Sequence, residues 1–207
     1  MRKPNVSAAL ALAAMLAVLL ASGPTAAGAQ TPAGHGAHGA AATAARTPQP
    51  AQAAKLDDPT IVAIFDAANT WDMETGALAA KKGRSKAVRD FGAMLVRDHR
   101  MVRQQGRDLA TRLQVTPTPP GKDFALAKEH AAAMRRLRAA KGRAFDRAFL
   151  EHEVAYHKAV VDAVTTTLLP SLQNQEVKDL VTKVAPAFQA HMAAAQNLLD
   201  RQTQQSQ

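Results

Sequence analysis

Residues 145–164 read FDRAFLEHEVAYHKAVVDAV, and large apolar side chains recur in this stretch at intervals of three and four residues. Such spacing gathers them on one side of an α-helix, whereas a half-buried strand would alternate apolar and polar residues. The same side carries Asp146, Glu153 and His157, so polar groups interrupt an otherwise apolar row. We therefore expect a long amphipathic helix whose core-facing side includes metal-capable residues.

Helical periodicity and turn signals divide the rest of the chain in the same way. The expected helices cover residues 58–82, 85–115, 123–140, 143–169 and 175–201. Asp58 before a proline, and Ser85 shortly after a glycine, are suited to begin helices. Pro170 is expected to end the fourth helix, and Pro186 to kink the last. No segment alternates as a strand does, so we predict an all-α fold: an antiparallel four-helix bundle with one extra short helix.

The ends of the chain differ in composition from this helical part. Arg2 and Lys3 precede an apolar run over residues 6–21, and Ala27-Gly28-Ala29 offers a small-residue cleavage site, as in a secretory signal peptide. The run is shorter than the roughly 20 residues that a membrane anchor requires. The predicted domains are a signal peptide (1–29), a disordered Ala/Pro/Gly-rich linker (30–56), the helical bundle (57–201) and a disordered tail (202–207). We accordingly expect export to the periplasm, or secretion, without a transmembrane anchor.

Composition narrows the chemistry that the chain can support. It has no cysteine, which excludes disulfides, thiolate zinc sites and covalently attached haem. Any metal must be bound by histidine, carboxylate or methionine. The net charge is +9, but only eight residues are aromatic, so nucleic acid is not an expected partner. The basic cluster of Arg135, Arg136 and Arg138 instead suits an anionic envelope surface.

Five polar residues lie in the apolar rows of the four long helices: Glu74, His99, Glu153, His157 and His191. Burying such a group without a partner is costly, so each needs a polar neighbour or a metal ion. Helical bundles build metal sites from side chains that project inward from several helices. We predict a mononuclear transition-metal site in the core, for zinc, copper or iron.

Two alternatives stay open at this point. The five residues can form one site or two clusters, because Glu74 and His99 differ in level by about seven residues, roughly 10 Å. They can also form a hydrogen-bonded network without metal, in a module that docks on an anionic partner or membrane surface. His130 and His152 are expected to be solvated at the surface, and Asp98 to be a surface or hairpin-stabilising charge. An enzyme is the least supported function, since no nucleophile motif, phosphate-binding glycine loop or dinucleotide signature is present.

Four segments carry a resemblance to a known family. They are ETGALA (74–79), FGAMLVRDH (91–99), GRAFDRAF (142–149) with His157 further on, and Ala185-Pro186 before His191. Together they resemble domain of unknown function 4142 over residues 57–200, which implies an exported bacterial protein with a ferritin-like four-helix fold. Ferritin-like di-iron sites use Glu-x-x-His, whereas Glu153 and His157 are four residues apart. A mononuclear, histidine-rich site fits better, with an expected role in metal handling or envelope stress.

Overall fold

The computed structural model describes residues 56–119 and 124–205, and every regular element within them is helical. The elements are α2 (Asp58–Lys82), α3 (Lys86–Arg112), α4 (Ala125–Ala139), α5 (Gly142–Ala163), η1 (Val164–Leu168), α6 (Leu169–Ser171) and α7 (Gln175–Gln204). This confirms the predicted all-α class. The expected signal peptide and nearly all of the expected linker lie outside the described residues. At the other end, α7 extends past residue 201, where the bundle was expected to finish.

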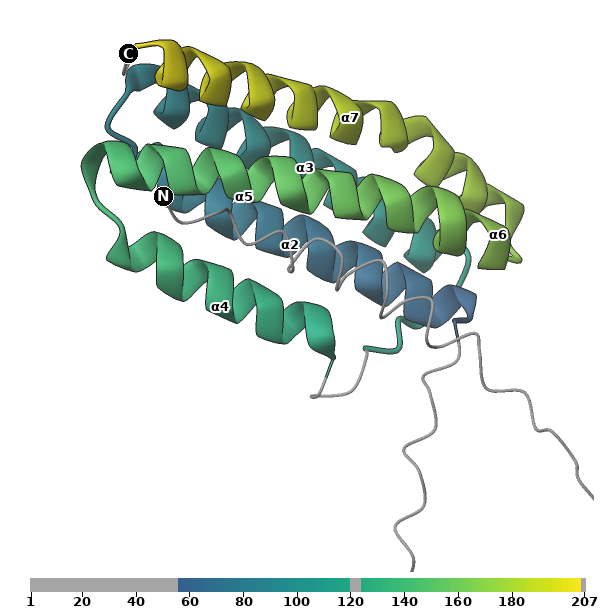
Figure 1. Ribbon diagram of the computed structural model, residues 1–207. Helices are drawn as coiled ribbons and strands as arrows, with labels where there is room; N and C mark the ends of the chain where they lie inside the picture. Colours follow the sequence, from purple (N-terminus) through teal and green to yellow (C-terminus); the bar gives the residue numbers. More distant parts are fainter. Residues whose placement is uncertain (1–55, 120–123, 206–207) are drawn as a thin grey trace, which may run out of the picture.

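Four long helices, α2, α3, α5 and α7, lie side by side, and α4 packs along the outside (Figure 1). Contacts run from α2 to α3, from α3 to α7, from α7 to α5 and from α5 back to α2. These neighbours are antiparallel; between α2 and α3, for example, Asn69 contacts His99 while Gly76 faces Gly92. α3 and α5 therefore run in the same direction, and α4 carries the chain back between them. Ferritin-like bundles have one such long crossover.

Two carboxylates tie the turns at the two ends of the bundle to the opposite helices. Asp146 of α5 is buried and accepts hydrogen bonds from two backbone N–H groups of the α2–α3 turn, at 2.7 and 2.8 Å. Asp58 of α2 does the same for the α6–α7 turn, at 2.8 and 2.7 Å. These N–H groups lack partners within their own helices. The N-cap of α2 is consequently Asp57, whose side chain accepts from the Thr60 N–H, and not Asp58 as predicted.

The sequence predicts that Pro170 ends the fourth helix, α5, but the helical run continues through this proline because the helix widens before it. The chain forms a π-helical turn, η1, after which the Leu169 N–H donates to the Val164 carbonyl five residues back. A proline has no N–H to donate and its ring crowds the carbonyl four residues earlier, and a local π-helical turn changes the hydrogen-bond pattern there. The helical run ends only after α6, where Leu172 is extended. Pro186 lies inside α7, which continues through it.

Apolar layers enclose a polar middle layer of the core. Towards one end, a buried cluster includes Ile61, Leu109, Val164 and Val181. Towards the other end, a second cluster includes Ala79, Leu95, Phe149 and Ala195. Between them lie the buried polar residues Asn69, Asp72, His99, Glu153, His157 and His191. Since this layer is shielded from water, its groups must satisfy one another or bind a ligand. None of the described helices combines the length and apolar character needed to cross a bilayer.

Helices α2 and α3 approach closely at Gly76 and Gly92. A Cβ atom on Gly92 would lie 2.5 Å from the Gly76 carbonyl oxygen and 2.8 Å from the Ala80 nitrogen. Both are backbone atoms, so relieving the clash requires the helices to separate. We expect Gly92→Ala to lower the free energy of unfolding by about 3 kcal/mol, measured by denaturant titration.

Gly106→Ala is the matched control on the same helix. Its Cβ atom would meet only the ring of Phe65, at 3.1 Å, and a side chain can turn aside. The gain in helix propensity, about 1 kcal/mol, offsets that small adjustment. Equal losses of stability at the two glycines would contradict the close backbone approach.

Candidate metal centre

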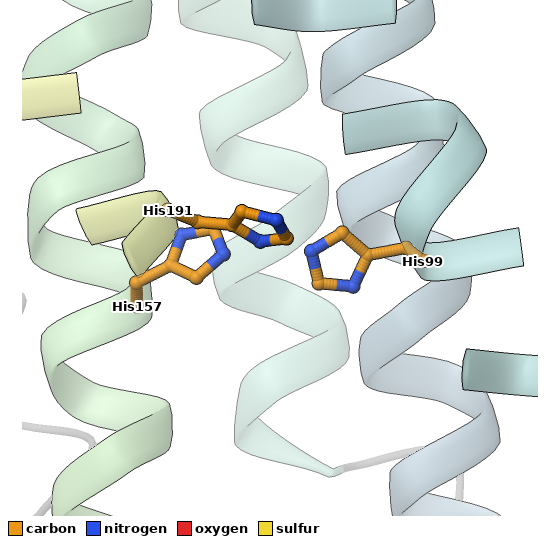
Figure 2. A group of neighbouring side chains, drawn as sticks. All are labelled: His99, His157 and His191. Atoms are coloured by element: carbon orange, nitrogen blue, oxygen red, sulfur yellow. The ribbon is translucent and has the colours of Figure 1, made fainter. Parts of the chain in front are cut away.

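Three histidines from three helices meet in the polar layer (Figure 2). His99 comes from α3, His157 from α5 and His191 from α7, and each is at most 5% exposed. Their ring centroids lie 5.6 Å (His99–His157), 5.1 Å (His99–His191) and 5.3 Å (His157–His191) apart. Each ring offers a nitrogen within 4.8 Å of a nitrogen of the other two. The structure thus brings three of the five predicted site residues to one level.

The hydrogen bonds of His99 leave one of its nitrogens free. Its Nδ1 lies 2.9 Å from the side-chain oxygen of Asn69. The amide nitrogen of Asn69 donates to the Phe65 carbonyl at 2.8 Å, which turns the amide oxygen towards the ring. An oxygen can only accept, so His99 Nδ1 carries the proton. The lone pair is therefore on Nε2, which is buried and has no hydrogen-bond partner.

The other two histidines are held in the same manner. His157 Nδ1 donates to the backbone carbonyl of Glu153 at 3.0 Å, which leaves Nε2 with the lone pair. His191 Nε2 donates to Asp98 Oδ2 at 3.2 Å, which leaves Nδ1 with the lone pair. Both remaining nitrogens are buried without a partner. Metal-binding histidines typically donate their second N–H to a carbonyl, carboxylate or amide in this way.

The electrostatics keep these rings in the form that binds metal. Burial, together with the neighbouring imidazoles, lowers the pKa of His99 to about 2 and that of His157 to about 3. Burial also lowers the pKa of His191, although Asp98 opposes this. All three rings are thus neutral at physiological pH, and neutral imidazole is the form that ligates a metal ion.

Asp72 of α2 adds a carboxylate that the sequence analysis missed. Its Oδ2 lies 3.4 Å from His99 Nε2 and 3.7 Å from His157 Nε2, and its side chain is 3% exposed. Asp72 is thus a candidate fourth ligand beside the three histidines, and such a donor set suits a transition-metal ion. The sequence did contain a signal for it. Because the helices on either side of Gly83 are antiparallel, the residue level with His99 lies close to Asn69, one helical turn before Asp72.

Glu153 lies beside this set, fully buried on α5. Its Oε2 is 3.4 Å from His157 Nδ1, and together with Asp72 and His157 it forms a second compact group of ligand atoms. Burial raises the pKa of Glu153 to about 7, and burial together with the nearby Glu153 raises the pKa of Asp72 well above its usual range. The two groups of ligand atoms in the structure therefore share His157, which joins them at one level of the core.

Glu74 was placed in the core by the sequence analysis, and the structure corrects this. Its side chain is 51% exposed and pairs with His130 Nε2 of α4 at 2.8 Å. The row that contains Glu74 also contains Trp71, whose ring stacks on His130. That row faces α4, which covers one side of α2, whereas Asn69 and Asp72 face the bundle core. Glu74 is consequently not part of the candidate centre.

Three residues expected at the surface have more specific positions. Asp98 is only 23% exposed and holds His191, while its other oxygen accepts from the exposed Arg97. His130 is 10% exposed under Trp71 and Glu74, and His152 is half-buried between α5 and α4. These residues were expected at the surface because their neighbours in the sequence are charged. In the structure each side chain nevertheless faces another helix.

The charge state of Glu153 predicts a pH-dependent effect on the stability of the metal-free protein. Because the pKa of Glu153 rises from 4.5 to about 7 on folding, its favourable contribution to stability is fully present below pH 4.5, decreases between these two values and is lost as pH rises through 7. Glu153→Gln cannot ionise, so we expect it to be more stable than the parent at pH 8, by about 2 kcal/mol, with the difference shrinking at pH 5. Denaturant titrations at both pH values test this. Glu151→Gln, on the exposed side of α5, should show no such difference.

The hydrogen bond from His191 to Asp98 predicts that Asp98 affects metal affinity although it is not a ligand. Asp98→Ala removes the acceptor that orients His191, and losses of this kind weaken metal binding about 10- to 100-fold. Competition with a chelator of known affinity would measure the change. Asp90→Ala, an exposed carboxylate on the same helix that pairs with Lys86, is the control and should leave the affinity unchanged.

The fold and the centre define a class of protein: a helical bundle whose shielded core layer carries histidine and carboxylate groups that can hold a metal ion. Residues 42–198 match the family described as Domain of unknown function (DUF4142), and the chain belongs to that family. This confirms the resemblance found in the sequence.

Comparison with solved structures supports the fold independently. The chain is similar to the crystal structure of a DUF305 fragment from Deinococcus radiodurans, with a TM-score of 0.59 and 16% sequence identity. The similarity covers 69% of this chain and 95% of that chain. At this level of identity the likeness concerns the fold alone. No curated protein matches the sequence.

Proposed function

We propose that the protein binds one transition-metal ion in its core, through His99, His157, His191 and Asp72. The observation that carries the proposal is the set of buried side-chain atoms that lack a hydrogen-bond partner. In the described part of the chain these atoms all belong to the four proposed ligands and to Glu153. Each unsatisfied buried group costs about 1–3 kcal/mol, a large penalty against a typical total stability of about 5–15 kcal/mol. A bound metal ion would satisfy most of them at once.

The donor set indicates which metals suit the centre and what the centre does. Three imidazoles and a carboxylate fit zinc, copper or iron better than magnesium or calcium, which prefer oxygen ligands. Four protein ligands can complete a tetrahedral sphere, whereas catalytic zinc sites keep one position for water or substrate. The centre therefore favours a role in holding or handling a metal over a role in catalysis.

We propose that this role is performed outside the cytoplasm, in keeping with the signal peptide expected over residues 1–29. The proposed roles are metal handling or stress tolerance in the bacterial envelope. Since the chain has no cysteine, the ion would be held there by histidine and carboxylate and not by thiolate. Cell fractionation and mass determination of the mature protein would test the export. Cleavage after Ala29 and recovery from the periplasmic fraction are the expected results, and a full-length cytoplasmic protein would contradict them.

Metal content tests the proposal itself. The mature protein, purified without a histidine tag from medium containing iron, copper and zinc, should carry about one ion per chain by elemental analysis. A protein that emerges empty, and that no added ion stabilises, would contradict metal binding.

A second candidate function rests on the exposed arginines of α4. Arg135, Arg136 and Arg138 are all exposed on this helix, as an interaction with an anionic envelope surface would require. The protein should sediment with anionic lipid vesicles and not with neutral ones. Its binding to the anionic vesicles should fall with rising salt and on replacing the three arginines by glutamine. Equal binding to both kinds of vesicle would rule this function out.

A further inference from the structure

A hollow between α4 and α5 lies on the same side of the bundle as Asp72 and Glu153. Its volume is about 130 Å³, enough for several water molecules. The walls include Glu129 and His130 from α4, and His152, Ala155 and Tyr156 from α5. The proposed metal centre does not use this hollow, and yet side chains of the types that bind metal ions line it.

The potential ligands in the hollow are less buried and less closely grouped than those of the core. His130 is positioned by stacking on Trp71, with ring centroids 5.5 Å apart, and by Glu74, whose carboxylate lies 2.8 Å from Nε2. Glu129 and His152 are half-buried on opposite walls. Among the described residues, the compact ligand groups are those of the core. The hollow is therefore suited to brief binding of a cation and not to its retention.

Tyr156 separates the hollow from the metal centre. Its ring lies edge-on to His157, with centroids 6.0 Å apart, and its hydroxyl donates to the Ala68 carbonyl at 3.1 Å. Tyr156 thus lines the hollow and contacts the metal centre at the same time.

The approach from the opposite side is less favourable for a cation. There His191 is covered by Asp98, and the guanidinium of Arg97 binds Asp98 at 2.8 Å. An incoming cation would meet the positive charge of Arg97 first. On the α4 side it meets Glu74 and Glu129, although Arg136 also lines the hollow there.

We propose that divalent metal ions enter through this hollow, where Glu129, His130 and His152 form a transit site, and pass Tyr156 to reach the core ligands. This inference rests on the proposed metal binding and adds the route by which the ion arrives. It assigns His130 and His152 an effect on the rate of uptake and none on the final metal content.

Stopped-flow absorbance with Co²⁺ as the probe ion tests the route in the metal-free mature protein. Two variants interfere with it by different means: His130→Ala with His152→Ala removes transit ligands, and Ala155→Phe fills the hollow. Both should slow uptake at least about tenfold while the final Co²⁺ content stays the same, because each changes only the route of association and leaves the core ligands intact. Glu151→Gln, an exposed neighbour on α5, should take up the ion at the parent rate.

The possible outcomes separate this inference from the proposed function. Unchanged uptake rates in both variants would overturn the route. So would a faster rate in Arg97→Gln combined with a normal rate in Ala155→Phe, because the ion would then enter beside His191. A parent protein that takes up no Co²⁺, Zn²⁺ or Cu²⁺ would overturn the metal centre itself and the route with it.

Discussion

Replacing His157 and His191 together by alanine is expected to reduce the metal content from about one ion per chain to nearly none. The variant loses two of four ligands, and since disturbing even an outer hydrogen-bond partner costs about 10- to 100-fold in affinity, the combined loss should exceed about 10³-fold. Elemental analysis of tag-free protein, with a chelator competition to follow the residual affinity, measures both quantities.

The matched control for this experiment also loses two histidines. His130 and His152 lie under α4, outside the core ligand set, so the variant with both replaced by alanine should keep its metal. Circular dichroism of both double variants should show the same helical content. Full metal content in the His157/His191 variant, or its loss in the control, would contradict the assignment of ligands.

Metal binding should also raise the thermal stability by a large amount. A ligand that binds only the folded state adds about 4 kcal/mol when its free concentration is about 1,000-fold above Kd. For a domain of this size, that corresponds to a rise in Tm of about 8–16 °C. Thermal unfolding of the metal-free protein, with and without added ion, measures the shift.

The rise in Tm is expected because the unpartnered lone pairs and carboxylates of the polar layer destabilise the metal-free protein. Asp72→Asn keeps the shape of the side chain but removes its charge, so the shift should become much smaller. A Tm that rises equally in the parent and in the His157/His191 variant would indicate nonspecific stabilisation by the ion.

The sequence was sufficient for the class of fold and for most helix positions. Apolar spacing and capping residues such as Ser85 are local signals, and local signals define helices well. The position of Pro170 was misjudged because the π-helical turn before it is not visible as a pattern of side chains. The N-cap of α2 was placed one residue late because two adjacent aspartates both suit an N-cap; Asp57 caps α2, whereas Asp58 binds the α6–α7 turn.

The residues of the candidate centre could be predicted on helices with one apolar side, because that side faces the core. They could not be predicted on a helix with two apolar sides. His99, His157 and Glu153 follow rows of large apolar residues, and the structure has all three in the core. Helix α2 packs against both the bundle core and α4. The row of apolar residues that includes Trp71 was assigned to the core, but it faces α4, and Glu74 lies on that side.

Asp98 was misplaced for a related reason. A residue next to His99 in sequence points about 100° away from it around the helix. Whether that direction meets solvent or another helix depends on the order of helices around the bundle. Because α7 lies beside α3, Asp98 reaches His191.

X-ray absorption spectroscopy of the metal-loaded protein tests the central claim most directly. We predict a first coordination shell of three imidazole nitrogens and one carboxylate oxygen at about 2.0–2.2 Å, with the outer-shell scattering typical of histidine. In Asp72→Asn the oxygen contribution should change while the three imidazoles remain. A shell dominated by water oxygens, or one that keeps its imidazoles in the His157→Ala, His191→Ala variant, would show that the ion binds elsewhere.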